Sequence, residues 1–235
     1  MGVLLEKTKI AENLLTNLSD LLGHFRGGLA ITVVLVGMLM AASTGIVGAT
    51  VVTMGMMSLP IMLQRGYQPS LATGTIAATG TLGQIIPPSI ALVLLGDVLS
   101  NAYQQAQLNM GIFAPKSVSV GDLFAGSLIP GLLLVALYLI YLILRAAFSP
   151  ASMPERPPTK AIALGSTFRA LVPPLLLIVA VLGSIIGGYA TPTEAAGVGA
   201  MGALLLALSY RKLTLNTLRD TCAATMSTTA MVFFI

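Results

Sequence analysis

The sequence predicts an all-α protein that lies mostly within a lipid bilayer. Of its 235 residues, 56% are hydrophobic and only 9% are charged, and the mean hydropathy is +0.93. A soluble domain carries roughly 25% charged residues, so this chain cannot cover itself with polar surface. Residues 27–63 and 70–96 contain no charged residue at all, and each run is long enough to cross a membrane. These observations disfavour a soluble enzyme, a nucleic-acid binder and a disordered tail.

The reactive side chains of the chain are too few for common catalytic or metal sites. The single cysteine, Cys222, excludes an intrachain disulfide, and the single histidine, His24, excludes a multi-histidine site. The sequence contains no nucleophile with a matching base, no phosphate loop and no dinucleotide fingerprint. We therefore predict that the protein is not an enzyme and binds no organic cofactor.

Residues 1–26 form the first predicted element, an amphipathic helix. Leucines recur with a 3.6-residue period from Leu4 to Leu22, and charged or amide side chains fill the opposite face. That polar face prevents the helix from spanning the bilayer, but the helix can lie at its surface as an interfacial arm. A soluble helix packed on another element is the alternative.

Residues 27–64 are predicted to form a re-entrant helical hairpin. The uncharged run is too long for one crossing and too short for two crossings with a loop. Ser43, Thr44 and Gly45 lie near its middle and supply a polar tip. One long tilted helix followed by a short helix fits the length equally well.

The positions of the basic residues favour the hairpin. Cytoplasmic loops of membrane proteins carry an excess of Lys and Arg. If residues 27–64 re-enter the membrane, all twelve basic residues except Lys116 lie on one side. If they cross once, Lys7, Lys9 and Arg26 move to the opposite side.

Residues 66–100 are predicted to form a broken transmembrane helix. Pro87 and Pro88 cannot donate backbone hydrogen bonds and clash with the preceding turn, and Gly80 and Gly83 allow the backbone to unwind. We expect the whole stretch 79–88 to leave helical geometry, although a kinked helix without a site is the alternative. Discontinuous helices of this kind form binding sites in secondary transporters.

The rest of the chain is predicted to contain a transmembrane helix at 121–148, a cytoplasmic linker at 149–169 and further transmembrane helices within 170–235. The linker is rich in proline and carries several charges. Thr191, Pro192 and Glu194 match a capping box at a helix start, which gives Glu194 a structural role.

The predicted membrane segments favour a sodium-coupled carrier of an organic anion. A proton pump usually needs a carboxylate or histidine deep in the membrane, and no such residue is present. Carbonyl groups of a broken helix can instead hold sodium, and the free N–H groups of half-helices suit an anion.

The segment from Met40 to Gly96 resembles the large membrane subunit, of the DctM type, of tripartite ATP-independent periplasmic (TRAP) transporters. The string from Gly80 to Ile90, Gly-Thr-Leu-Gly-Gln-Ile-Ile-Pro-Pro-Ser-Ile, carries most of this resemblance. The Ser43-Thr44-Gly45 tip, Arg65-Gly66-Tyr67, Gly27-Gly28-Leu29-Ala30 and Thr191-Pro192-Thr193-Glu194 also match. The resemblance extends over essentially the whole chain.

The resemblance implies an inverted-repeat, elevator-type fold in the bacterial inner membrane. The family works with a small four-helix membrane subunit and a periplasmic substrate-binding protein, and it imports carboxylates with Na+ as the coupling ion. The implied sodium-binding residues are Ser43, Thr44, Gly45, Thr79, Gly80, Thr81, Gly83, Ile85 and Pro88. The implied substrate-binding residues are Ser43, Thr44, Gly45 and Ser89.

The sequence also departs from the family pattern. Many members carry Ser-Gly-Ser-Ser at the tip, where this chain has Thr44-Gly45-Ile46-Val47. We expect the chain to be an incomplete part of the fold, without the second hairpin and second sodium site. A binding-protein-independent sodium/dicarboxylate carrier and a non-transporting membrane scaffold subunit are the alternative functions.

Overall fold

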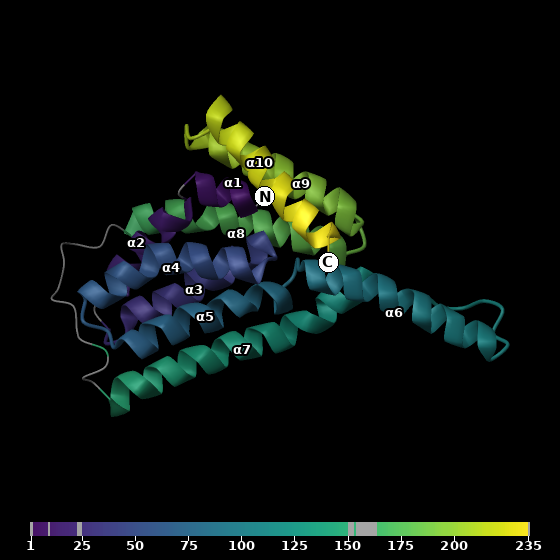
Figure 1. Ribbon diagram of the computed structural model, residues 1–235, viewed down its shortest axis with the longest axis horizontal. Helices are drawn as coiled ribbons and strands as arrows, with labels where there is room; N and C mark the ends of the chain where they lie inside the picture. Colours follow the sequence, from purple (N-terminus) through teal and green to yellow (C-terminus); the bar gives the residue numbers. More distant parts are fainter. Residues whose placement is uncertain (1, 9, 23–24, 150–152, 154–163, 235) are drawn as a thin grey trace.

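A computed structural model describes residues 2–8, 10–22, 25–149, 153 and 164–234, and every regular element within these ranges is an α-helix (Figure 1). The helices are α1 Gly2–Lys7, α2 Ile10–Leu21, α3 Gly28–Thr44, α4 Val47–Gln64, α5 Pro69–Ile85, α6 Ile90–Asn109, α7 Val120–Phe148, α8 Leu164–Ile186, α9 Pro192–Ser209 and α10 Leu215–Phe233. The predicted all-α fold class is confirmed.

Four segments are long and apolar enough to cross a membrane by length and composition: Val47–Gln64, Pro69–Asn109, Val120–Phe148 and Pro192–Ser209. No more than 33% of the most apolar stretch of any of them is buried inside the bundle. Most of their apolar side chains therefore face outward, and lipid suits such a surface far better than water does.

Helix α3 lies at the centre of the bundle, with α4 and α5 packed against it (Figure 1). Its valines Val33 and Val36 are fully buried. Small residues let the three helices approach closely: a β-carbon at Gly80 of α5 would lie 3.2 Å from the Cα atom of Val51 in α4. This close packing holds the end of α3 against the end of α5.

The predicted arm helix at 1–26 is divided into two helices, α1 and α2. Beside the division, the Thr8 hydroxyl donates to the carbonyl oxygens of Leu4 and Leu5, at 2.8 and 3.1 Å. Such local side-chain bonds compete with the helical ladder. The apolar face of α2, with Leu15 and Leu18 buried, packs on α3 and α8. The position of this arm at the membrane interface stays a prediction.

Helix α6 extends further than predicted, to Asn109 instead of residue 100. Its outer half leaves the bundle and projects beyond every other element (Figure 1). Helix α7 begins beside Gly96 of α6, where a β-carbon would lie 3.5 Å from the Val120 Cα atom. From there α7 runs back along α3 and α5.

Helices α8, α9 and α10 complete the bundle. Helix α8 packs on α2 and α9, and α10 packs on α1. Most of the predicted linker at 149–169, namely residues 150–152 and 154–163, lies outside the described residues. Residues 164–169 are helical and not part of a linker, because the proline-rich stretch ends at Pro158 and nothing after it opposes a helix.

Candidate functional site

The first part of the site is the turn between α3 and α4. Helix α3 ends because Gly45 adopts the left-handed conformation, with φ of 66°, that glycine tolerates without strain. The hydroxyl of Ser43 donates to the Met40 carbonyl oxygen at 2.8 Å, and that of Thr44 lies 2.7 Å from the Thr50 hydroxyl. The chain therefore turns sharply, with its tip hydroxyls tied to neighbouring groups.

The second part is the interruption between α5 and α6. Residues 86–89 separate the two helices, and Ile86 and Ser89 have extended backbones. The interruption lies where the proline pair predicts one, since neither Pro87 nor Pro88 can donate to the preceding turn. The Ser89 hydroxyl caps α6 by accepting from the Leu92 N–H, and it donates to the Gln84 carbonyl oxygen at 2.8 Å.

The interruption is shorter than the sequence predicts. Thr79, Gly80, Thr81 and Gly83 stay within α5, so the expectation that 79–88 leaves helical geometry is wrong for these residues. The glycines serve packing rather than unwinding: Gly80 lies against Val51, where a side chain would not fit. The prolines alone are sufficient to end the helix.

The turn and the interruption contact each other directly. The Gln84 side-chain amide donates to the Gly45 carbonyl oxygen at 3.3 Å. A β-carbon at Gly45 would lie 3.3 Å from the Pro88 carbonyl oxygen and 3.6 Å from the Ile90 nitrogen. Two chain breaks, separated by about forty residues in sequence, thus form a single junction inside the apolar bundle.

A pocket of about 230 Å³ opens at this junction. Ser43, Pro88 and Ser89 line it, and α6, α7, α8 and α9 complete its wall with Ile90, Val93, Phe124, Val181, Ile185, Pro192, Ala196 and Gly199. None of these lining residues is charged. Two of the helices, α6 and α9, begin at this pocket.

Three of the predicted sodium-site residues lie away from the junction. Gly80 faces α4, and the exposed Thr81 donates to the Ala78 carbonyl oxygen at 2.7 Å. Thr79 donates to the Thr75 carbonyl oxygen at 2.6 Å and lines a different pocket. The remaining predicted residues, Ser43, Thr44, Gly45, Gly83, Ile85, Pro88 and Ser89, lie at the turn, at the interruption or in the adjoining last turn of a helix.

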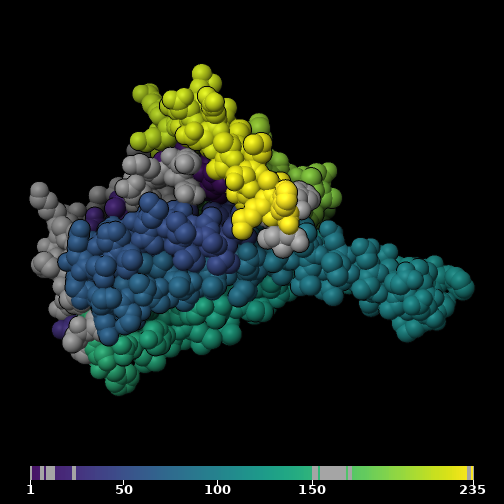
Figure 2. All heavy atoms as spheres, in the orientation of Figure 1, coloured from purple at the N-terminus to yellow at the C-terminus, as the bar shows by residue number. Residues whose placement is uncertain are grey.

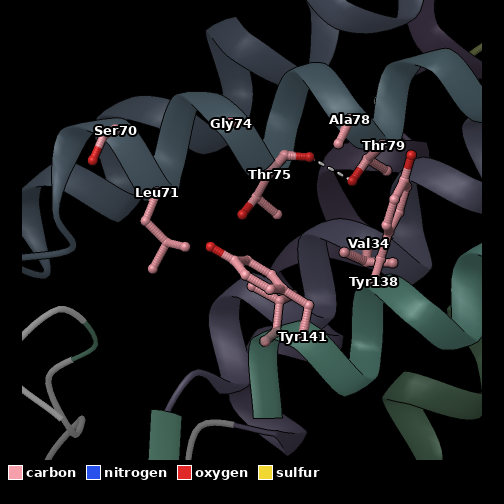
Figure 3. A pocket seen from close by; sticks show the side chains of 10 residues that line it. Val34, Ser70, Leu71, Gly74, Thr75, Ala78, Thr79, Tyr138 and Tyr141 are labelled. Atoms are coloured by element: carbon pink, nitrogen blue, oxygen red, sulfur yellow. Dashed lines mark hydrogen bonds between the residues drawn. The ribbon is translucent and has the colours of Figure 1, made fainter. Parts of the chain in front are cut away.

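The pocket beside Thr79 has a volume of about 280 Å³ and lies between α3, α5 and α7 (Figure 3). Tyr138 and Tyr141 of α7 face Ser70, Thr75 and other residues of α5 across it (Figure 3). Its walls are mostly apolar, and the helices around it are continuous, so it offers no freed backbone groups. We therefore take the smaller pocket at the junction as the candidate site.

Sequence reasoning missed several residues of this site. Gln84 bridges the interruption to the turn, and it is the only amide side chain between residues 70 and 96. A lone amide in a long apolar run is unusual, so the sequence alone offered a reason to include Gln84 among the site residues. Phe124 and the lining residues of α8 and α9 carry no local signal, because only the tertiary fold brings them to the pocket.

Acidic side chains take no part in the candidate site. Within the described residues, no group of three or more His, Cys, Asp or Glu side chains could hold a metal ion. The Glu194 carboxylate accepts from the Thr191 N–H at 2.8 Å, and the Glu194 N–H donates to the Thr191 hydroxyl. The predicted capping box is confirmed. A second capping box, Ser119 with Asp122, begins α7.

The described architecture defines a class of protein. A helix interrupted within an apolar bundle, with another helix end packed against it, is the arrangement by which secondary transporters hold ions and substrates. The described fold and site are typical of membrane transport proteins.

Comparison with known proteins gives the family. The model of the family described as "Tripartite ATP-independent periplasmic transporter, DctM component" matches residues 1–235. The chain belongs to this family, as its sequence motifs predict, and is a multi-pass protein of the inner membrane.

Curated relatives carry different substrate names. The chain is 34% identical over its whole length to a C4-dicarboxylate TRAP transporter large permease protein of Pseudomonas aeruginosa, covering 51% of that protein. It is 32% identical to an ectoine/5-hydroxyectoine large permease of Ruegeria pomeroyi, over 91% of this chain and 46% of the relative. It is 29% identical to a sialic acid permease of Haemophilus influenzae, over 98% of this chain and 35% of the relative.

Two facts follow from these relatives. They are named as permease proteins rather than enzymes, in agreement with the prediction from sequence. The chain spans about half the length of the C4-dicarboxylate permeases of Pseudomonas aeruginosa and Rhodobacter capsulatus, covering 51% and 50% of them.

Proposed function

We propose that the chain forms part of a sodium-driven importer that takes up an organic anion with the help of a periplasmic binding protein. The observation that carries this proposal is the set of backbone carbonyl groups at the junction.

The interruption leaves carbonyl oxygens without helical donors. Residues 87 and 88 are prolines, so the Gly83 and Gln84 carbonyl oxygens lose the N–H groups four residues ahead. The Ser89 hydroxyl satisfies Gln84. Within the described residues, the carbonyl oxygens of Gly83, Ile85 and Pro88 accept no hydrogen bond.

Such carbonyl groups favour a cation. An unsatisfied polar group in an apolar environment costs roughly 1–3 kcal/mol by mutational measures. A sodium ion takes oxygen ligands and would satisfy several of these groups at once. We therefore assign the sodium site to the junction, with Gly83, Ile85 and Pro88 contributing carbonyl oxygens beside the Ser43-Thr44-Gly45 turn.

The adjoining pocket is suited to an anion. Helix α6 begins at Ile90, and the N–H groups of Ile90 and Ala91 have no hydrogen-bond partner within the described part of the chain. The positive end of a helix dipole attracts negative charge. A carboxylate could thus be held beside Ser43 and Ser89 without an arginine in the membrane.

The choice of substrate class and partners rests on the family. Two relatives are named for a C4-dicarboxylate and for sialic acid, which agrees with an acid as substrate. The family description names a tripartite periplasmic transporter, of which DctM is one component. We assign the other two components to a small membrane subunit and a periplasmic substrate-binding protein.

The test uses the complete transporter, purified and reconstituted in liposomes with its binding protein. We expect an inward sodium gradient to drive uptake of one of three labelled probes: a C4-dicarboxylate, ectoine or sialic acid. Potassium in place of sodium should abolish this uptake. Equal uptake in sodium-free buffer would contradict sodium coupling, and uptake without the binding protein would favour the binding-protein-independent carrier.

A second readout needs no substrate. A ligand that binds only the folded state raises the thermal unfolding temperature. We expect sodium, but not potassium at equal ionic strength, to raise that temperature for the purified transporter. A response to neither ion, together with no uptake of any probe, would favour the scaffold function.

A further inference from the structure

The half-buried Gln84 lies where the candidate sodium site and the anion pocket meet. Figure 2 shows the blue mass of α4 and α5 and the teal α6 that continues outward from it. Gln84 is the second-last residue of α5, so it lies where these parts join. Its neighbours Gly83 and Ile85 carry two of the carbonyl oxygens assigned to sodium. The proposed function gives the Gln84 side chain itself no part.

The Gln84 side chain links the interruption to the turn. Its amide donates to the Gly45 carbonyl oxygen at 3.3 Å, across 39 positions of the sequence. Within the described residues, no other hydrogen bond joins residues 43–46 to residues 84–90. Removing this amide would therefore leave the two segments joined by packing alone.

The Gln84 backbone contacts one wall of the pocket. Its carbonyl oxygen accepts from the Ser89 hydroxyl at 2.8 Å, and that hydroxyl lies 3.5 Å from the Gln84 Oε1 atom. Ser89 caps α6 and lines the pocket, and Ser43 lines the pocket from the turn. Gln84 thus contacts one wall through Ser89 and holds the other in place through Gly45.

An uncharged donor suits this position. A lysine or an arginine could also bond the Gly45 carbonyl oxygen, but its positive charge would repel a sodium ion at the junction. An ionised carboxylate has no hydrogen to donate, whereas the glutamine side chain donates through N–H groups without carrying a charge. Gln84 can therefore hold a carbonyl oxygen beside a cation site without opposing the cation.

We infer that Gln84 is a positioning residue of the sodium site, which holds the turn at Gly45 against the interruption. The inference rests on the proposed function, because that function places sodium between these two segments. Carbonyl oxygens that are held in place in advance lose less conformational freedom when the ion binds, so the ion binds more tightly. Gln84 raises the sodium affinity in this way without itself contacting the ion.

The first test asks whether the amide holds the turn, and it needs neither sodium nor substrate. Hydrogen–deuterium exchange is measured on the complete transporter, purified in potassium, for peptides that contain the turn. Gln84→Met keeps a side chain of similar length but has no N–H donor. We expect it to speed exchange of the backbone N–H groups around Gly45 by about threefold or more, because local opening of the turn then breaks one hydrogen bond fewer. Unchanged exchange would overturn the inference.

The second test measures the sodium concentration that gives half-maximal uptake in liposomes. The probe is whichever labelled compound the wild type takes up: a C4-dicarboxylate, ectoine or sialic acid. We expect Gln84→Met to raise that sodium concentration by about threefold to tenfold, the fold-change that corresponds to one hydrogen bond between neutral groups. A residue that only stabilises the fold would lower the thermal unfolding temperature and leave the half-maximal sodium concentration unchanged, and that result would overturn the inference.

Two control variants accompany Gln84→Met. Gln64→Met makes the same substitution at the exposed last residue of α4, which lies 18 residues and about 27 Å of helix from the turn, and it should change neither readout. Gln84→Asn keeps the amide but shortens the side chain by one methylene group, and the bond to Gly45 is already long at 3.3 Å. We expect Gln84→Asn to behave like Gln84→Met. Wild-type behaviour of Gln84→Asn in both readouts would overturn the inference.

The outcomes separate this inference from the proposed function. Sodium-driven uptake by the wild type, with the same half-maximal sodium concentration in a folded Gln84→Met transporter, would overturn the inference alone. Wild-type uptake that is equal in sodium and in potassium would overturn the proposed function, whichever way the exchange of the turn responds to Gln84→Met.

Discussion

At the scale of single residues, the two glycines near the end of α5 have different roles. A β-carbon at Gly80 would lie 3.2 Å from the Val51 Cα atom, and backbone atoms cannot move aside easily. A β-carbon at Gly83 would meet Ala41 atoms at 3.6–3.7 Å, which is ordinary contact. Gly80 is therefore required for packing, whereas Gly83 has room for a methyl group.

This difference predicts opposite effects of the same substitution. Gly80→Ala should destabilise the protein by about 1–3 kcal/mol, the usual cost of overpacking. Gly83→Ala should leave stability unchanged or raise it, since alanine favours a helix by about 1 kcal/mol over glycine. Thermal unfolding of both variants in detergent checks this, and an equal loss in both would contradict the packing argument.

Two hydroxyl groups near the junction, those of Ser89 and Thr81, also have different roles. The Ser89 hydroxyl joins the two helix ends, because it donates to the Gln84 carbonyl oxygen and accepts from Leu92. The Thr81 hydroxyl only donates to its own helix, and the residue is exposed.

Ser89→Ala should therefore cost about 1–3 kcal/mol, because it removes a helix cap and leaves the half-buried Gln84 carbonyl oxygen unpaired. Thr81→Val should change stability by less than about 0.5 kcal/mol, as surface substitutions usually do. The comparison uses thermal unfolding of the purified variants. A larger loss for Thr81→Val than for Ser89→Ala would show that the Ser89 bonds do not hold the junction.

Local chemistry made part of this site predictable. The proline pair predicts an interruption, and Thr191 with Glu194 predicts a helix start, because both effects act within a few residues. The packing role of Gly80 was not predictable, since it arises from the contact with Val51 of another helix. The bond from Gln84 to Gly45, and the walls of the pocket from α8 and α9, likewise arise only from tertiary contacts.

At the scale of elements, the pair α3 and α4 determines the topology. The two helices pack on each other and are joined at Gly45 and Ile46 (Figure 1). Helix α3 has 17 residues and α4 has 18, so each is near or just below the usual length of a full span. The re-entry of this pair from one side of the membrane stays a prediction.

Accessibility at both ends of the pair tests it. Single cysteines replace Arg26 and Arg65 in the complete transporter, and the exposed Cys222 is replaced by serine. A membrane-impermeant thiol reagent should label both positions only from the cytoplasmic side. A cysteine at the exposed Phe113, between α6 and α7, is the control and should label from the periplasm. Labelling of positions 26 and 65 from opposite sides would contradict the hairpin.

At the scale of the whole molecule, the candidate site draws on helices that lie far apart along the chain. The pocket at the junction combines the first helices of the chain with α8 and α9, and the relatives are about twice as long as the chain. We propose that the proline interruption at residues 87 and 88 creates the sodium site. The complete transporter is the molecule in which this claim can be measured.

The most direct measurement is the sodium concentration that gives half-maximal uptake in Pro87→Ala. An alanine at 87 restores an N–H that can bond the Gly83 carbonyl oxygen and continue α5. Pro60→Ala, which changes a proline inside α4 away from the junction, is the matched control. We predict that Pro87→Ala raises the half-maximal sodium concentration by about tenfold or more, which corresponds to a loss of about 1.4 kcal/mol in sodium binding. Pro60→Ala should raise that concentration by less than about twofold. An unchanged half-maximal sodium concentration in a stably folded Pro87→Ala transporter would contradict the account.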